Sequence, residues 1–139
     1  MILCIKSDSD QLELRLATNP NEQVSQVFET GRKLALKLPR LIDTFLNDQG
    51  HQLTDISGIV CYEGPGSFTG LRIGHTYANA LAYSLALPIV QAGGESWVAS
   101  GIELLRSGKN EKIVIPRYGS EAHISVQKSK NNNVQPLAY

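Results

Sequence analysis

The sequence predicts an α/β domain in which helices flank a mixed β-sheet. Two observations support this class. The first thirty residues hold three short apolar or alternating runs separated by turns, which is typical of antiparallel strands. From there on, segments of helical period alternate with short apolar runs, which is typical of parallel strands joined by helices. With 139 residues, 42% of them hydrophobic, the chain is long enough to bury a core.

The opening strands are recognised by their period and by the turns between them. Ile2–Lys6 is a short apolar run, and Leu12–Leu16 alternates with period two, as a half-buried strand does. A turn at Asn19-Pro20-Asn21 precedes a third run at residues 23–28. We therefore expect a three-stranded antiparallel meander.

The rest of the chain alternates helix and strand. Apolar residues at helical spacing predict an amphipathic helix from Gly31 to about Asn47, ended by Gly50, with Pro39 kinking it or marking its real start. Buried strands follow at residues 57–62 and 88–92, and helices at residues 70–86 and 95–106. The order is βββαβαβα, with parallel strands placed beside the meander.

The residues after 107 repeat the start of the chain in strand pattern. Residues 113–116, 122–126 and 134 correspond in order to residues 2–5, 12–16 and 24, at an offset close to 110. Three ordered matches suggest a duplicated unit. We therefore expect a first lobe at residues 1–107 and a rudimentary second lobe of about three strands at residues 108–139.

Charge and composition narrow the classes of function. Thirteen basic and thirteen acidic residues cancel, so nothing global attracts the chain to nucleic acid or to an anionic membrane. No apolar run has transmembrane length and the start lacks the features of a signal peptide, so the expected location is cytoplasmic. Cys4 and Cys61 lie in apolar runs and are expected to be buried, reduced thiols.

A glycine-rich stretch between the strand at 57–62 and its helix could cradle a phosphate or could be a turn that serves packing. Free N–H groups at the helix start can bind an anion, and Arg72 could meet a phosphate, Glu63 or solvent. Ser67 or Thr69 could instead cap the helix. A P-loop needs a lysine after its last glycine, where this chain has Leu71-Arg72. The stretch consists of Gly64, Pro65, Gly66, Ser67, Phe68, Thr69 and Gly70.

The helix after this stretch carries more apolar surface than one sheet needs. Its apolar positions cover roughly 200° of arc, and small residues recur at steps of four from Gly70 to Ala82. This pattern fits tight packing against the first helix within the chain, or a second buried face that contacts a partner. The preceding helix carries Lys33, Lys37 and Arg40 on one side, a charged face that is either solvated or selects an acidic partner.

Catalytic constellations are absent from the sequence. His51, His75 and His123 fall in separate segments without metal-ligand spacing. Ser67 is not in a nucleophile elbow. We therefore expect no enzyme activity, no metal and no cofactor.

The run "GPGSFTGLRIG", with "ILCI" at the start and "LALPIVQAGGESWVASG" after it, resembles the signature of the bacterial TsaB (YeaZ) family over about residues 1–107. The resemblance implies an RNase H-like (actin/hexokinase/Hsp70-like) fold. It also implies a non-catalytic scaffold subunit of the machinery that makes tRNA threonylcarbamoyladenosine. Its partner would be a TsaD-like subunit, with a TsaE-like ATPase as a further candidate partner and tRNA contacted only indirectly.

The resemblance places the partner contact on the first two helices, in a heterodimer or a homodimer. A charge at Ala78 should then abolish pairing and leave the monomer folded. Where the family has Asp-Thr-Ser after the first strand, this chain has Lys6-Ser7-Asp8, which makes a nucleotide role less expected. A nucleotide-binding or phosphotransfer protein and a self-associating homodimeric remnant remain the alternatives. The predicted interface residues are Lys33, Lys37, Arg40, Gly74, Tyr77, Ala78 and Leu81.

Overall fold

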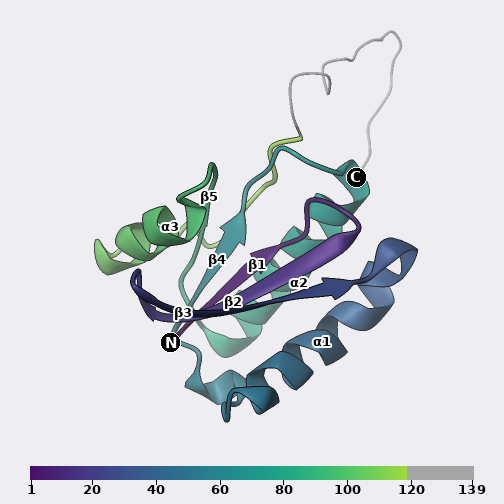
Figure 1. Ribbon diagram of the computed structural model, residues 1–139. Helices are drawn as coiled ribbons and strands as arrows, with labels where there is room; N and C mark the ends of the chain where they lie inside the picture. Colours follow the sequence, from purple (N-terminus) through teal and green to yellow (C-terminus); the bar gives the residue numbers. More distant parts are fainter. Residues whose placement is uncertain (119–139) are drawn as a thin grey trace, which may run out of the picture.

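The computed structural model describes residues 1–118, which contain one five-stranded mixed sheet with helices on both faces (Figure 1). The strands lie in the order β3-β2-β1-β4-β5. This is the predicted α/β class with a mixed sheet. The strands are β1 (Ile2–Lys6), β2 (Gln11–Asn19), β3 (Glu22–Glu29), β4 (Gly58–Tyr62) and β5 (Ile89–Ala92), and the helices are α1 (Leu34–Asp48), α2 (Phe68–Leu85) and α3 (Trp97–Arg106).

The strand pairing confirms the predicted antiparallel meander and the parallel strands beside it. β1 pairs antiparallel with β2, and β2 pairs antiparallel with β3. On its other side β1 pairs parallel with β4, which pairs parallel with β5. The carboxyl ends of β1 and β4 therefore lie side by side, and the segments that follow them, residues 7–10 and 63–67, meet there.

Alternation along β1 separates two hydrophobic cores. Leu3 and Ile5 point to the face that α1 and α2 cover, and Cys4 points to the face that α3 covers. Both cysteines are buried free thiols, as predicted, and Cys61 lies in the core on the α1–α2 side. Burial raises the pKa of the Cys4 thiol to about 12 and raises that of Cys61 as well, so both stay protonated near neutral pH.

The starts of all three helices differ from the prediction, and α3 begins at Trp97 where the prediction had residue 95. The first helix begins as a single 3-10 turn at Gly31–Lys33 and becomes α-helical at Leu34, so Pro39 lies inside α1 and does not mark its start. Helix α2 begins at Phe68, two residues before the predicted start at Gly70, because Ser67 caps it. Gly50 follows α1 with φ of +79°, which favours glycine.

The strand expected at residues 113–116 is not formed. The backbone N–H and C=O of Val114 both bond to the side-chain amide of Asn79 on α2, at 2.9 and 3.0 Å. Pro116 has no N–H to offer a ladder. The remaining strands of the expected second lobe fall on residues 119–139, outside the described part of the chain.

Candidate partner interface

The glycine-rich stretch, residues 64–70, packs against the residues that follow β1. A Cβ added to Gly66 would lie 2.5 Å from Asp8 Cβ, and one added to Gly70 would lie 2.5 Å from Ser7 O. The backbone N–H of Ser67 donates to Asp8 O at 2.8 Å. Glycines are therefore required here because another part of the backbone approaches closely.

The space around the first turns of α2 is also filled by other residues of this chain. The Ser67 hydroxyl accepts from the N–H of Gly70 at 3.2 Å and so caps the helix. Buried Ser7 donates to Gly70 O at 2.9 Å, and a Cβ on Gly74 would lie 2.0 Å from Ser7 Oγ. Two of the small residues at steps of four, Gly70 and Gly74, thus make room for Ser7, so this close packing is against the segment after β1 and not against the first helix, where the packing alternative placed it.

Arg72 lies beside an aromatic side chain of the same stretch. Its guanidinium is 5.7 Å from the centre of the Phe68 ring, within the range of a cation–π contact. The Phe68 ring in turn lies 4.4 Å from that of Tyr118. Glu63, one of the partners proposed for Arg72, forms an ion pair with Arg117 at 3.7 Å.

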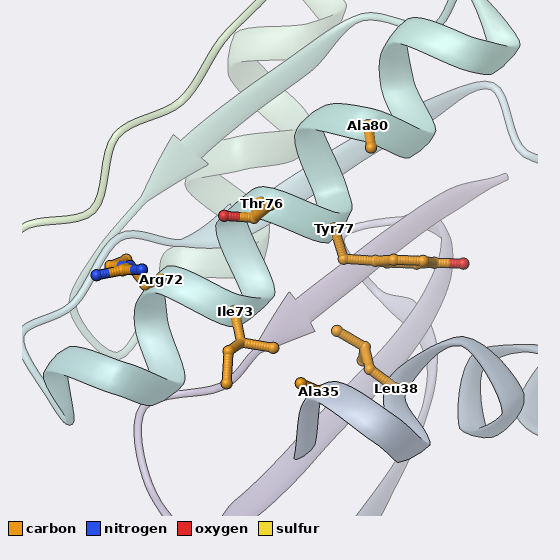
Figure 2. A pocket seen from close by; sticks show the side chains of 7 residues that line it. All are labelled: Ala35, Leu38, Arg72, Ile73, Thr76, Tyr77 and Ala80. Carbon is orange, nitrogen blue, oxygen red and sulfur yellow. The ribbon is translucent and has the colours of Figure 1, made fainter. Parts of the chain in front are cut away.

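A groove with a volume of about 410 Å³ runs between α1 and α2 (Figure 2). Ile73 and Tyr77 point from α2 toward Ala35 and Leu38 of α1. The walls are mostly apolar, and the groove is open to solvent. Its lining residues are Ala35, Leu38, Arg72, Ile73, Thr76, Tyr77 and Ala80.

Three of the predicted interface residues do not reach this surface. Ala78 is fully buried, Leu81 is 8% exposed, and Gly74 is buried against Ser7. The helical period identified an apolar face, but that face packs on the sheet. Tyr77, predicted with them, is half-buried and lines the groove.

The predicted basic residues are all exposed on the first helical segment. Lys33 ends the 3-10 turn, and Lys37 and Arg40 follow on α1. The first turn of α1 contains no acidic residue, so Lys33 and Lys37 add to the positive end of the helix dipole, whereas Arg40 lies further along the helix. This arrangement does not stabilise the helix, and it creates a positive potential that suits an acidic partner.

An exposed apolar residue that was not among the predicted interface residues, Leu36, accompanies these cations. Leu36 is 78% exposed and, with Leu41, Lys37 and Arg40, lines a second hollow of about 440 Å³. Leu36 lies outside the buried stripe of Leu34, Leu38 and Ile42, and this offset from the stripe was the signal available in the sequence.

The titratable groups near the groove have structural partners. His75 is buried, with Nδ1 3.0 Å from Leu71 O and Nε2 3.0 Å from the Gln91 side-chain amide. Burial lowers its pKa. Burial, and then the Asp43 carboxylate, raise the pKa of Tyr77. Across residues 1–118, no three His, Cys, Asp or Glu side chains gather as metal ligands, and no helix is long and apolar enough to span a membrane.

Comparison with known proteins connects this geometry to a family. The family model for TsaD, tRNA N6-adenosine threonylcarbamoyltransferase, matches residues 28–119. The tRNA threonylcarbamoyladenosine biosynthesis protein TsaB of Bacillus subtilis is 50% identical over 48 residues, which is 34% of this chain and 21% of that protein. TsaB of Escherichia coli is 38% identical over 61 residues, 44% of this chain and 26% of that protein.

A solved structure supports the fold. YeaZ from Pseudomonas aeruginosa superposes with a TM-score of 0.59 at 24% identity, over 66% of this chain and 43% of that one. The matched parts thus span between 21% and 43% of these relatives' lengths.

The strand order, the helix placement and the family match are those of an RNase H-like, actin/hexokinase-type fold. The family model covers well over half of the chain, and the chain belongs to the TsaD family. The relatives named TsaB and YeaZ confirm the resemblance identified from the sequence.

Proposed function

We propose that this chain is a non-catalytic scaffold subunit of the machinery that makes tRNA threonylcarbamoyladenosine, and that it pairs with a TsaD-like catalytic subunit. The observation that carries this proposal is the apolar groove between α1 and α2, which is open along two helices of the lobe. The names of the matched relatives indicate the process, which is the biosynthesis of tRNA threonylcarbamoyladenosine.

The chemistry of the surface describes the partner. Leu36, at 78% exposure, offers apolar area that a partner would gain free energy by covering. Lys37 and Arg40 lie next to it, and Lys37 belongs to the first turn of α1, at the positive end of the helix dipole. A helix or ridge with apolar residues in its centre and carboxylates at its rim would complement both features.

The packing of the glycine stretch argues against the nucleotide-binding alternative. The space that a phosphate would need beside Gly66 and Gly70 is filled by Asp8 and by the carbonyl of Ser7. The N–H of Gly70, in the first turn of α2, already donates a hydrogen bond to the Ser67 hydroxyl. Calorimetry with ATP or ADP at about millimolar concentration, with and without magnesium, should therefore give no binding heat.

The deciding experiment mixes this chain with the TsaD homologue of the same organism and weighs the products by light scattering after gel filtration. A heterodimer is the expected result. A chain that remains monomeric in the mixture would contradict the proposal. A homodimer that ignores TsaD would also contradict it, and would favour the self-associating alternative through the same two helices.

A further inference from the structure

The segment of residues 110–118, here called the strap, is fixed to the domain at several points. Its first residues cover the free edge of β5: the N–H of Glu111 donates to Ile89 O at 2.9 Å, and the Glu111 carboxylate accepts from Gln91 N at 2.9 Å. Near its other end, the N–H of Arg117 donates to Glu63 O at 2.7 Å, beside the loop that follows β4 (Figure 1). The strap therefore crosses from the sheet edge to the glycine stretch.

The middle of the strap alternates sharply between buried and exposed side chains. Val114 is 2% exposed, lies in the core on the α1–α2 side and is held by both ends of the Asn79 amide. Its neighbours Ile113 and Ile115 are 68% and 70% exposed. Two large aliphatic side chains are thus presented to solvent from a backbone that is already immobilised, so covering them would cost little ordering entropy.

The strap forms one wall of a third hollow, of about 340 Å³, whose other wall is α2. This hollow and the α1–α2 groove share two lining residues, Arg72 and Thr76. These two exposed residues form a ridge along α2, with α1 on one side and the strap on the other. A partner seated over that ridge contacts both walls.

We infer that the TsaD-like partner binds across α2 and covers Ile113 and Ile115 as well as the α1–α2 groove. This inference rests on the proposed function and extends its interface from two helices to three elements. The supporting observation is continuity, because the two hollows meet at Arg72 and Thr76. The strap then acts as a second wall that fixes how the partner is oriented on α2.

The test uses the full chain and the TsaD homologue of the same organism, with the dissociation constant measured by calorimetry. The variants are Ile113→Ser, Ile115→Ser and the double variant. We expect each single change to weaken binding about tenfold, since burying one isoleucine contributes on the order of a factor of ten or more in affinity. Val24→Ser and Val27→Ser are matched controls, because both valines are exposed, at 44% and 53%, but lie on β3 at the opposite edge of the sheet.

The outcomes separate the two proposals. Weaker binding by the isoleucine variants, with unchanged binding by the valine controls, supports the inference. Unchanged binding by the double variant overturns it and leaves the proposed pairing intact. Equal weakening by the valine controls also overturns it, because the effect would then not belong to the strap. If the unmodified chain does not bind TsaD at all, the proposed function itself fails and the inference falls with it.

Discussion

The two faces of α2, one packed against the domain and one open to solvent, use small residues in opposite ways. At its N-terminal end, Gly70 and Gly74 admit Ser7 so closely that no Cβ would fit. On the other face, Thr76 and Ala80 are exposed and line the open groove beside α1. The glycines of the most distinctive motif in the sequence are thus used in internal packing, whereas the candidate contact surface is built from non-glycine residues of the same helix, with Arg72 and Ile73 of the motif among them.

The physical reason for this division lies in what each task demands. Close backbone approach has few solutions, because only glycine lacks the Cβ that would clash. An open, apolar groove can be built from many side chains of suitable size. A recognisable motif is therefore better evidence for a fold than for a contact surface.

The largest expected effect comes from introducing the same negative charge on the buried face and on the exposed face of α2. Ala78→Asp puts a carboxylate where the side chain is fully buried, and Ala80→Asp puts it on the exposed wall of the groove. We expect Ala78→Asp to lower the free energy of unfolding by on the order of 4 kcal/mol, because the buried charge has no partner. We expect about 1 kcal/mol or less for Ala80→Asp. Urea denaturation measures both.

The same pair of variants corrects the expectation drawn from the sequence for Ala78. A charge there should unfold the monomer, whereas the charge at Ala80 should leave it folded and abolish pairing with TsaD in the light-scattering experiment. A folded Ala78→Asp monomer that no longer pairs would contradict the burial of this residue and return it to the interface.

A second test concerns the contact between α2 and the strap. Asn79→Ala removes both hydrogen bonds to the backbone of Val114. We expect a loss of about 1–3 kcal/mol in the free energy of unfolding, since two buried backbone groups lose their partners. Amide exchange at Val114 should accelerate as well. The matched control is Asn47→Ala on α1, whose side chain is exposed and whose loss should change neither quantity.

An unchanged exchange rate at Val114 in Asn79→Ala would show that the strap is held mainly at its ends, by Glu111 and Arg117. It would then be wrong to treat Ile113 and Ile115 as a preformed surface. A slower exchange rate would contradict the assigned bonds altogether.

Most of the sheet and the helices could be predicted from the sequence because each element carried its own period and its own turn residues. Ile2–Lys6 matched β1 residue for residue, and the period-two run at Leu12–Leu16 lies inside β2. The start of α2 was misplaced by two residues because a cap depends on the geometry of the preceding turn. The sequence pattern was sufficient for those elements whose formation depends mainly on residues close together in the chain.

The candidate site was less predictable because period shows which residues share a face but not what covers that face. Ala78 and Tyr77 adjoin on α2, yet the first is in the core and the second is on the groove wall. Val114 looked like a strand residue, and its apolar character did indicate burial, but its bonding partner is a side chain 35 residues away. Contacts of this kind depend on tertiary packing, which one sequence does not display.

The smallest expected effect concerns His75, which lies on the buried face of α2. Burial lowers its pKa in the folded chain below the value of about 6.5 that it has when unfolded. The unfolded chain therefore binds the proton more readily, so this contribution to stability is complete above pH 6.5 or so and is lost as the pH falls below it. Glu63 is the nearby carboxylate that opposes the shift. Urea denaturation between about pH 7.5 and 5.5 should show the free energy of unfolding declining with acid.

The control variants for this test are His75→Gln and His51→Gln. His75→Gln removes the titrating group and should flatten the decline, whereas His51→Gln, at a partly exposed position beside Asp55, should leave it in place. If stability instead rises as the pH falls from 7.5 to 5.5, His75 must be protonated in the folded chain, with both ring nitrogens donating. Its contacts to Leu71 and Gln91 would then stabilise the charged form by more than burial destabilises it. The surroundings of His75 on the buried face of α2 would in that case be more polar than the packing indicates.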